Sequence, residues 1–268
     1  MINRKHAETA FDKYISRYDR DNKMISLKVE HTFRVADNCE LIARSLKMSE
    51  ELVDFAWFLG LLHDIGRFEQ VKRYGTFVDA VSVDHAEFGA DLLFKENHIH
   101  EFLERPISDE WMSVLDTAIR AHNKLEISEE YDKRTRRFCE LIRDADKVDI
   151  FRVVNEKSFE ERMGTSVGII QEAEEANSAV MKCVLRHRCV PREIKKTRFE
   201  GHISYCCMAF ELVYPESKKL AAEQGYLEKL LEEYDEKGNP LWKEKELIQL
   251  RILKGEIEKV IKIFSKSV

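Results

Sequence analysis

The chain has few of the residues that interrupt helices. Ten glycines and four prolines make up about 5% of its 268 residues, against roughly 12% in average proteins. No segment alternates apolar and polar residues for long, whereas apolar residues recur every three, four and seven positions, as in Val29, Phe33 and Ala36. We therefore predict an all-α protein built from long helices.

Long apolar runs and cysteine motifs are also missing. The longest apolar run, residues 55–62, is far below the ~20 residues that span a bilayer. The N-terminal sequence MINRKHAETAFDK has no apolar signal core, so we expect a cytoplasmic protein without membrane contact. The six cysteines show no CxxC spacing, and we expect them to be reduced and to pack as small hydrophobic groups.

The charge balance argues against a nucleic-acid-binding surface. The formal net charge is -6, and the 44 basic and 50 acidic residues are mixed rather than gathered in blocks. We therefore expect no extended nucleic acid as a partner. A small anionic ligand would have to be held by local charges or by a metal.

The most informative residues are the adjacent pair His63 and Asp64 in FLGLLHDIGRF. Imidazole nitrogens and carboxylate oxygens are both metal ligands. Other histidines and an aspartate lie on segments with helical periodicity, which gives a candidate cluster of His31, His63, Asp64, His85, His122 and Asp146. Adjacent residues diverge by ~100° on a helix, so this pair can face one site only at a helix end, or if the carboxylate bridges two ions. Gly66 is a plausible stop for that helix.

The periodicity predicts where the cluster would lie. Residues 51–63 are apolar nearly all round, which is typical of a central buried helix. A second helix is expected to start near 106–109 and to end at about His122, and a third to end near Arg152. Further helices are expected around 170–187 and 202–214, followed by a turn at 237–240 and a final helix.

The helix that ends near Arg152 carries three aspartates close together. Asp146 lies four residues after Ile142, on the stripe predicted to be buried, whereas Asp144 lies on a different face. Asp149 shares the inner face with Asp146. We expect it to hydrogen-bond a ligating histidine without binding the metal itself, and so to fix the tautomer of that histidine.

His31 in VEHTFRVADNCELIA, the HD pair and Asp146 in IRDADKVDI together resemble the H…HD…D signature of HD-domain phosphohydrolases. The resemblance covers roughly residues 25–152. It implies an HD-domain-like helical bundle in which His31, His63, Asp64 and Asp146 coordinate a divalent metal. We expect an HD-type domain over residues 1–155. Residues 156–268 are then a helical extension that packs on the same core.

His85 in DHAEFGADLL and His122 in AIRAHNK resemble the additional ligands of the family members that hold two metals. These include cyclic-nucleotide phosphodiesterases, HD-GYP phosphodiesterases and symmetrical dinucleoside tetraphosphate hydrolases. The GYP tripeptide is absent here, and the spacing is most similar to that of the dinucleotide hydrolases. A set of His and Asp ligands suits one or two ions of Mn, Fe, Zn, Co or Mg.

The resemblance implies hydrolysis of a phosphoester or phosphoanhydride bond in a nucleotide or another small phosphorylated molecule. Asp64, Arg67 and Lys147 are the candidate catalytic residues, because they stand in or beside the metal motifs. The candidate phosphate contacts are Arg67, Lys124, Lys147 and Arg34. Two other interpretations stay open, a di-iron oxygenase and a non-catalytic nucleotide-sensing module. The final helix could also pack on a second copy in a homo-oligomer.

Overall fold

The computed structural model describes residues 2–156 and 173–262. These residues form helices and no strand, apart from one isolated antiparallel bridge between Tyr234 and Pro240. The predicted all-α class is therefore confirmed. Within the same residues no helix is long and apolar enough to cross a membrane, and all six cysteines are free thiols.

The described residues group into two compact units, and the division falls between Asp149 and Ile150, inside one helix. The predicted division at residue 155, with a C-terminal part packed on the same core, stays a prediction. The helices of the first unit are α1 (Arg4–Ile15), α2 (Lys23–Ser45), α3 (Glu50–Leu62), α4 (Ile65–Tyr74), η1 (Asp79–Val81), α5 (His85–Ala90), η2 (Asp91–Lys95), α6 (Ile99–Phe102), α7 (Asp109–Ala121) and α8 (Lys133–Glu156), which continues into the second unit.

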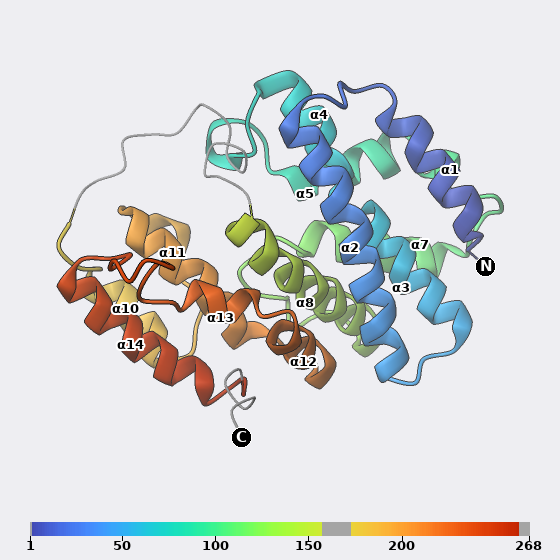
Figure 1. The fold of residues 1–268 in the computed structure, drawn as a ribbon. Coiled ribbons are helices and arrows are strands. Elements are labelled where there is room, and N and C mark those ends of the chain that lie inside the picture. Colours follow the sequence, from blue (N-terminus) through green and yellow to red (C-terminus); the bar gives the residue numbers. More distant parts are fainter. Residues whose placement is uncertain (1, 157–172, 263–268) are drawn as a thin grey trace. The chain divides into compact units, whose positions relative to one another are not determined.

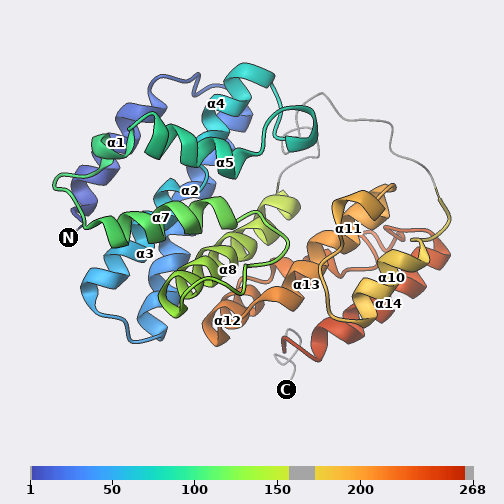
Figure 2. The same cartoon turned by 180° about the vertical axis from the view of Figure 1, so that it is seen from behind.

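Helix α3 is the centre of the first unit. Its residues from Phe55 to Leu62 are all buried, as predicted for a helix that is apolar on every side. Helices α2 and α3 lie side by side in both views (Figure 1, Figure 2). A Cβ atom on Gly60 would lie only 2.6 Å from the Cα atom of Ala36, so glycine allows the two helices to approach closely.

The helical conformation is interrupted between α3 and α4, at His63 and Asp64. His63 caps the C-terminus of α3, and Asp64 takes a non-helical conformation as the N-cap of α4. The helix end that the pair requires is therefore present, but the prediction that Gly66 stops the helix is wrong. Gly66 lies in the first turn of α4. A Cβ on it would lie 2.7 Å from Gly89 N, so its role is to let α4 pack closely against α5.

The second unit is also helical. Its helices are α10 (Ser178–Leu185), η3 (Arg192–Ile194), α11 (Arg198–Cys207), η4 (Met208–Glu211), α12 (Pro215–Glu223), α13 (Tyr226–Leu230) and α14 (Glu244–Glu258). The helix predicted over 202–214 starts earlier, because Thr197 and Glu200 form a capping box, and it ends in the 3-10 turn η4. The helix predicted over 170–187 is α10 from Ser178 on, and its predicted start lies outside the described residues. The predicted turn is present, with Gly238 at φ 80°.

Candidate metal centre

The first unit brings together all six residues of the candidate cluster. Each comes from a different helix or helix end: His31 from α2, His63 and Asp64 from the break between α3 and α4, His85 from the start of α5, His122 from the C-cap of α7 and Asp146 from α8. The four histidines and Asp64 are buried, and the Asp146 side chain is 16% exposed. Residues up to 115 positions apart in the chain thus converge on one site.

Asp64 lies between two pairs of histidines. Its Oδ2 atom is 3.7 Å from His31 Nε2 and 3.6 Å from His63 Nε2. Its Oδ1 atom is 3.5 Å from His85 Nε2 and 3.7 Å from His122 Nε2. Each oxygen of the carboxylate therefore faces its own pair of ring nitrogens.

Asp146 completes the arrangement on one side of Asp64. Its Oδ1 atom is 3.1 Å from His31 Nε2 and 3.9 Å from His63 Nε2. Three sets of three ligand atoms drawn from these six residues alone lie within 4.8 Å of one another: His31, His63 and Asp64; His63, His122 and Asp146; and Asp64, His85 and His122. Asp64 belongs to two of these sets, once with His31 and His63 and once with His85 and His122.

In each of the four histidines of the cluster, the Nδ1 atom lies 2.7 Å from an oxygen acceptor. His31 Nδ1 lies against Asp149 Oδ2 and His85 Nδ1 against Asp79 Oδ2. The other two histidines contact backbone carbonyls, those of Gly60 and Ile119. A carboxylate or carbonyl can only accept, so each Nδ1 carries a proton and each ring turns its Nε2 atom into the cluster. The position expected for Asp149 is the one observed.

The donor set fits a divalent cation. His63 Nε2 and Asp64 Oδ1 are buried and have no hydrogen-bond partner. His85 Nε2 and His122 Nε2 are 3.1 Å apart, and two lone pairs that face each other repel unless a positive charge lies nearby. Buried polar atoms are normally paired, and a cation on each side of the Asp64 carboxylate would satisfy these atoms.

The protonation states suit metal binding as well. Burial lowers the pKa of His63 to about 3 and that of His85 to about 4, so both rings are neutral at neutral pH. Burial alone would raise the pKa of Asp64, but the Lys28 ammonium beside it holds that pKa well below its usual range. Metal ligands must be deprotonated, and these groups already are.

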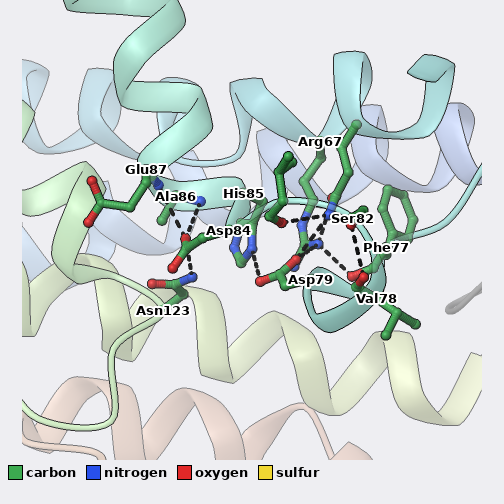
Figure 3. A network of polar contacts seen from close by, with 12 residues as sticks. Arg67, Phe77, Val78, Asp79, Ser82, Asp84, His85, Ala86, Glu87 and Asn123 are labelled. Atoms are coloured by element: carbon green, nitrogen blue, oxygen red, sulfur yellow. Dashed lines mark hydrogen bonds and ion pairs between the residues drawn. The ribbon is translucent and has the colours of Figure 1, made fainter. Parts of the chain in front are cut away.

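A polar network supports His85 from outside the cluster (Figure 3). The Asp79 carboxylate, at the start of η1, binds His85 through Oδ2. Through Oδ1 it accepts hydrogen bonds from Arg67 Nη1 at 2.9 Å and from Gln70 Nε2 at 3.0 Å. Gln70 is fully buried and also donates to Ser82 Oγ. Sequence reasoning missed Asp79 and Gln70, because neither adjoins a metal motif.

The four predicted phosphate contacts lie in different surroundings. Arg67 is near the cluster, with Nε 3.5 Å from Asp64 Oδ1. Arg34 Nε donates to Asp149 Oδ1 at 2.7 Å, so it supports the carboxylate that contacts His31. Lys124 pairs with Asp84 at 2.8 Å, and Lys147 is buried beside Asp146 in the chain. Their contact with a phosphate stays a prediction.

Lys28 is a further residue at the cluster that sequence reasoning missed. Its Nζ atom lies 2.6 Å from Asp64 Oδ2. The available signal was its spacing, since it precedes His31 by three residues and so shares a helix face with it. Asp144, predicted to lie on a different face from the buried stripe, is itself fully buried, whereas the Asp146 side chain is 16% exposed.

The comparison with protein families agrees with this geometry. The family model of the HD domain matches residues 29–150. This segment contains every residue of the cluster. No curated protein and no solved structure was found to match the chain. HD domains are for the most part metal-dependent hydrolases. Residues 29–150 thus match an HD domain in sequence, in their all-helical fold and in the buried His and Asp cluster that they hold.

Proposed function

We propose that this protein is a two-metal phosphohydrolase that cleaves a phosphoester or phosphoanhydride bond in a nucleotide or another small phosphorylated molecule. The observation that carries the proposal is the position of Asp64. One of its oxygens faces His31 and His63, and the other faces His85 and His122. A carboxylate in this position can bridge two ions, each of which also takes imidazole ligands.

In the proposed assignment the first ion would be held by His31, His63, Asp64 and Asp146. The second would be held by Asp64, His85 and His122. Divalent ions at such sites lower the pKa of a coordinated water toward ~7 and neutralise phosphoryl oxygens.

The other residues supply orientation and charge in this proposal. Asp149 and Asp79 keep the imidazoles of His31 and His85 in the ligating tautomer. Arg67 is oriented by Asp79 and points its guanidinium toward Asp64, where it can neutralise charge that develops on a phosphate. Lys147 is proposed to assist from α8, next to Asp146.

The experiment that tests this function measures phosphate release by the purified protein. The protein is loaded separately with Mn, Fe, Zn, Co or Mg and offered a nucleoside monophosphate, a cyclic dinucleotide and a dinucleoside tetraphosphate. We expect turnover of at least one class, and its loss in Asp64→Asn. Asp12→Asn is the matched control, because the Asp12 side chain is 64% exposed in α1.

Two outcomes would point elsewhere. Oxygen consumption by the iron-loaded protein without phosphate release would favour the oxygenase interpretation. Saturable nucleotide binding without turnover under every metal would favour the sensing module. Either result in a wild-type protein with full metal content would contradict the proposed hydrolase.

The assignment of the second ion has its own test. The double variant His85→Ala with His122→Ala should bind about one ion fewer per chain than wild type and keep the first ion. Elemental analysis of protein purified without chelator measures this directly. Unchanged metal content in the double variant would contradict the two-ion assignment.

A further inference from the structure

Lys28 links the buried cluster to solvent. It lies on α2, one turn before His31. Its Nζ atom is 2.6 Å from Asp64 Oδ2, and its side chain is 15% exposed, against 3% for Asp64. The ammonium group is thus bound to the central carboxylate while the side chain keeps part of its surface accessible.

Lys28 and Arg67 form a pair around one aromatic ring. Lys28 Nζ and Arg67 Cζ are each 5.4 Å from the centroid of the Phe77 ring. Lys28 approaches Asp64 at Oδ2 and Arg67 approaches it at Oδ1. A ring face attracts cations without neutralising their charge, so Phe77 holds two positive groups at the edge of the cluster.

The contact between Lys28 and Asp64 conflicts with metal binding. The same Oδ2 atom faces His31 Nε2 and His63 Nε2, so a divalent ion held by these groups would lie beside the ammonium. Two positive charges in contact repel strongly inside a protein, where the dielectric constant is low. The ammonium would then need another anion, and the four-carbon stem of lysine gives it the reach to find one.

We propose that Lys28 is a catalytic residue that exchanges Asp64 for a phosphate oxygen of the substrate once the metal site is filled. It would act together with Arg67, so that the two cations on Phe77 neutralise one phosphoryl group. This proposal rests on the proposed phosphohydrolase function. It identifies where the substrate phosphate binds relative to the cluster, on the side of the Phe77 ring.

The test measures the affinity of metal-loaded protein for inorganic phosphate by isothermal titration calorimetry, beside the metal content of the same samples. Lys28→Gln removes the charge, Lys28→Met keeps most of the stem, and Lys28→Arg keeps the charge. Lys23→Gln is the matched control, because Lys23 is exposed at the start of the same helix. We expect unchanged metal content in all four variants.

Phosphate should bind about 10- to 100-fold more weakly to Lys28→Gln and Lys28→Met, the loss expected for one hydrogen bond between charged groups. Lys28→Arg should retain most of the affinity, and Lys23→Gln should match wild type. With a substrate that turns over, the loss of charge should lower kcat/KM by a similar factor.

Three results would overturn the proposal. Equal phosphate affinity in wild type and Lys28→Gln would show that Lys28 is only a counter-ion of Asp64. A fall in metal content in Lys28→Gln and Lys28→Met would show that it supports the metal site instead. A wild-type protein that binds metal but neither binds phosphate nor releases it from any substrate would refute the proposed function itself. That failure is distinguishable because it appears without any substitution.

Discussion

Replacing Gly66 by alanine should damage the candidate metal centre without changing a ligand. An added Cβ would lie 2.6 Å from His85 O, 2.7 Å from Gly89 N and 2.8 Å from Gly89 Cα. All three are backbone atoms, so no side-chain rotation can make room. Helix α5 would have to move away from α4, and His85 is the first residue of α5.

The contact distances set the size of the effect. Overpacking of a well-packed site costs roughly 1–3 kcal/mol, and we expect Gly66→Ala to lose that much stability. Gly89→Ala should lose less, because its Cβ would meet Gly66 N at 3.0 Å and Gly66 Cα at 3.3 Å. Gly201→Ala in α11 meets nothing within 4 Å, so it should gain about 0.5–1 kcal/mol from helix propensity.

Urea unfolding followed by circular dichroism measures this series, and elemental analysis of the folded variants reports the proposed second ion. Gly66→Ala should shift the unfolding midpoint to lower urea and release the ion proposed at His85 before the one proposed at His31. The reasoning is refuted if Gly66→Ala unfolds at the wild-type midpoint, or if Gly201→Ala is the less stable of the two.

Two further predictions concern carboxylates that hold other groups in place. Asp79→Asn should lower the affinity for the second ion about 10- to 100-fold, because Asp79 binds His85 Nδ1 and Arg67 together; metal titration checks this, and an unchanged affinity would show that His85 needs no such support. Glu200→Gln should destabilise the second unit by roughly 2–3 kcal/mol, since the buried carboxylate accepts the backbone N–H groups of Lys196 and Thr197; exposed Glu193→Gln is the control in thermal unfolding. Burial raises the pKa of Glu200, but its backbone hydrogen bonds outweigh burial and lower this pKa in the folded protein. The stabilisation by Glu200 should therefore be present above the unfolded pKa of about 4.3 and be lost as pH falls through the lower folded pKa. Equal pH dependence of stability in wild type and Glu200→Gln would contradict this.

The sequence was sufficient for the fold class and for the members of the cluster. Helical periodicity and the scarcity of glycine and proline predicted the all-α architecture, because both are local properties of the chain. The HD pair required either a helix end or a bridging carboxylate. The structure has the helix end, and the carboxylate lies where it can bridge.

The supporting residues could not be predicted in the same way. Asp79 reaches the cluster through a contact between separate helices, and no motif marks it. For Lys28 the only signal was its spacing from His31 on α2, which does not show that its ammonium reaches Asp64. Gly66 was misinterpreted because a glycine after an apolar helix usually marks its end, whereas here its lack of a side chain allows the backbone of α5 to approach. Asp144 is fully buried although it lies outside the stripe that the periodicity predicted to be buried.

The most direct test of the central claim is a crystal structure of the metal-loaded protein with anomalous scattering recorded at the absorption edge of the bound metal. We predict two peaks, one beside His31, His63 and Asp146 and one beside His85 and His122, with an oxygen of Asp64 next to each. A single peak, or two peaks that do not share Asp64, would contradict the two-metal centre.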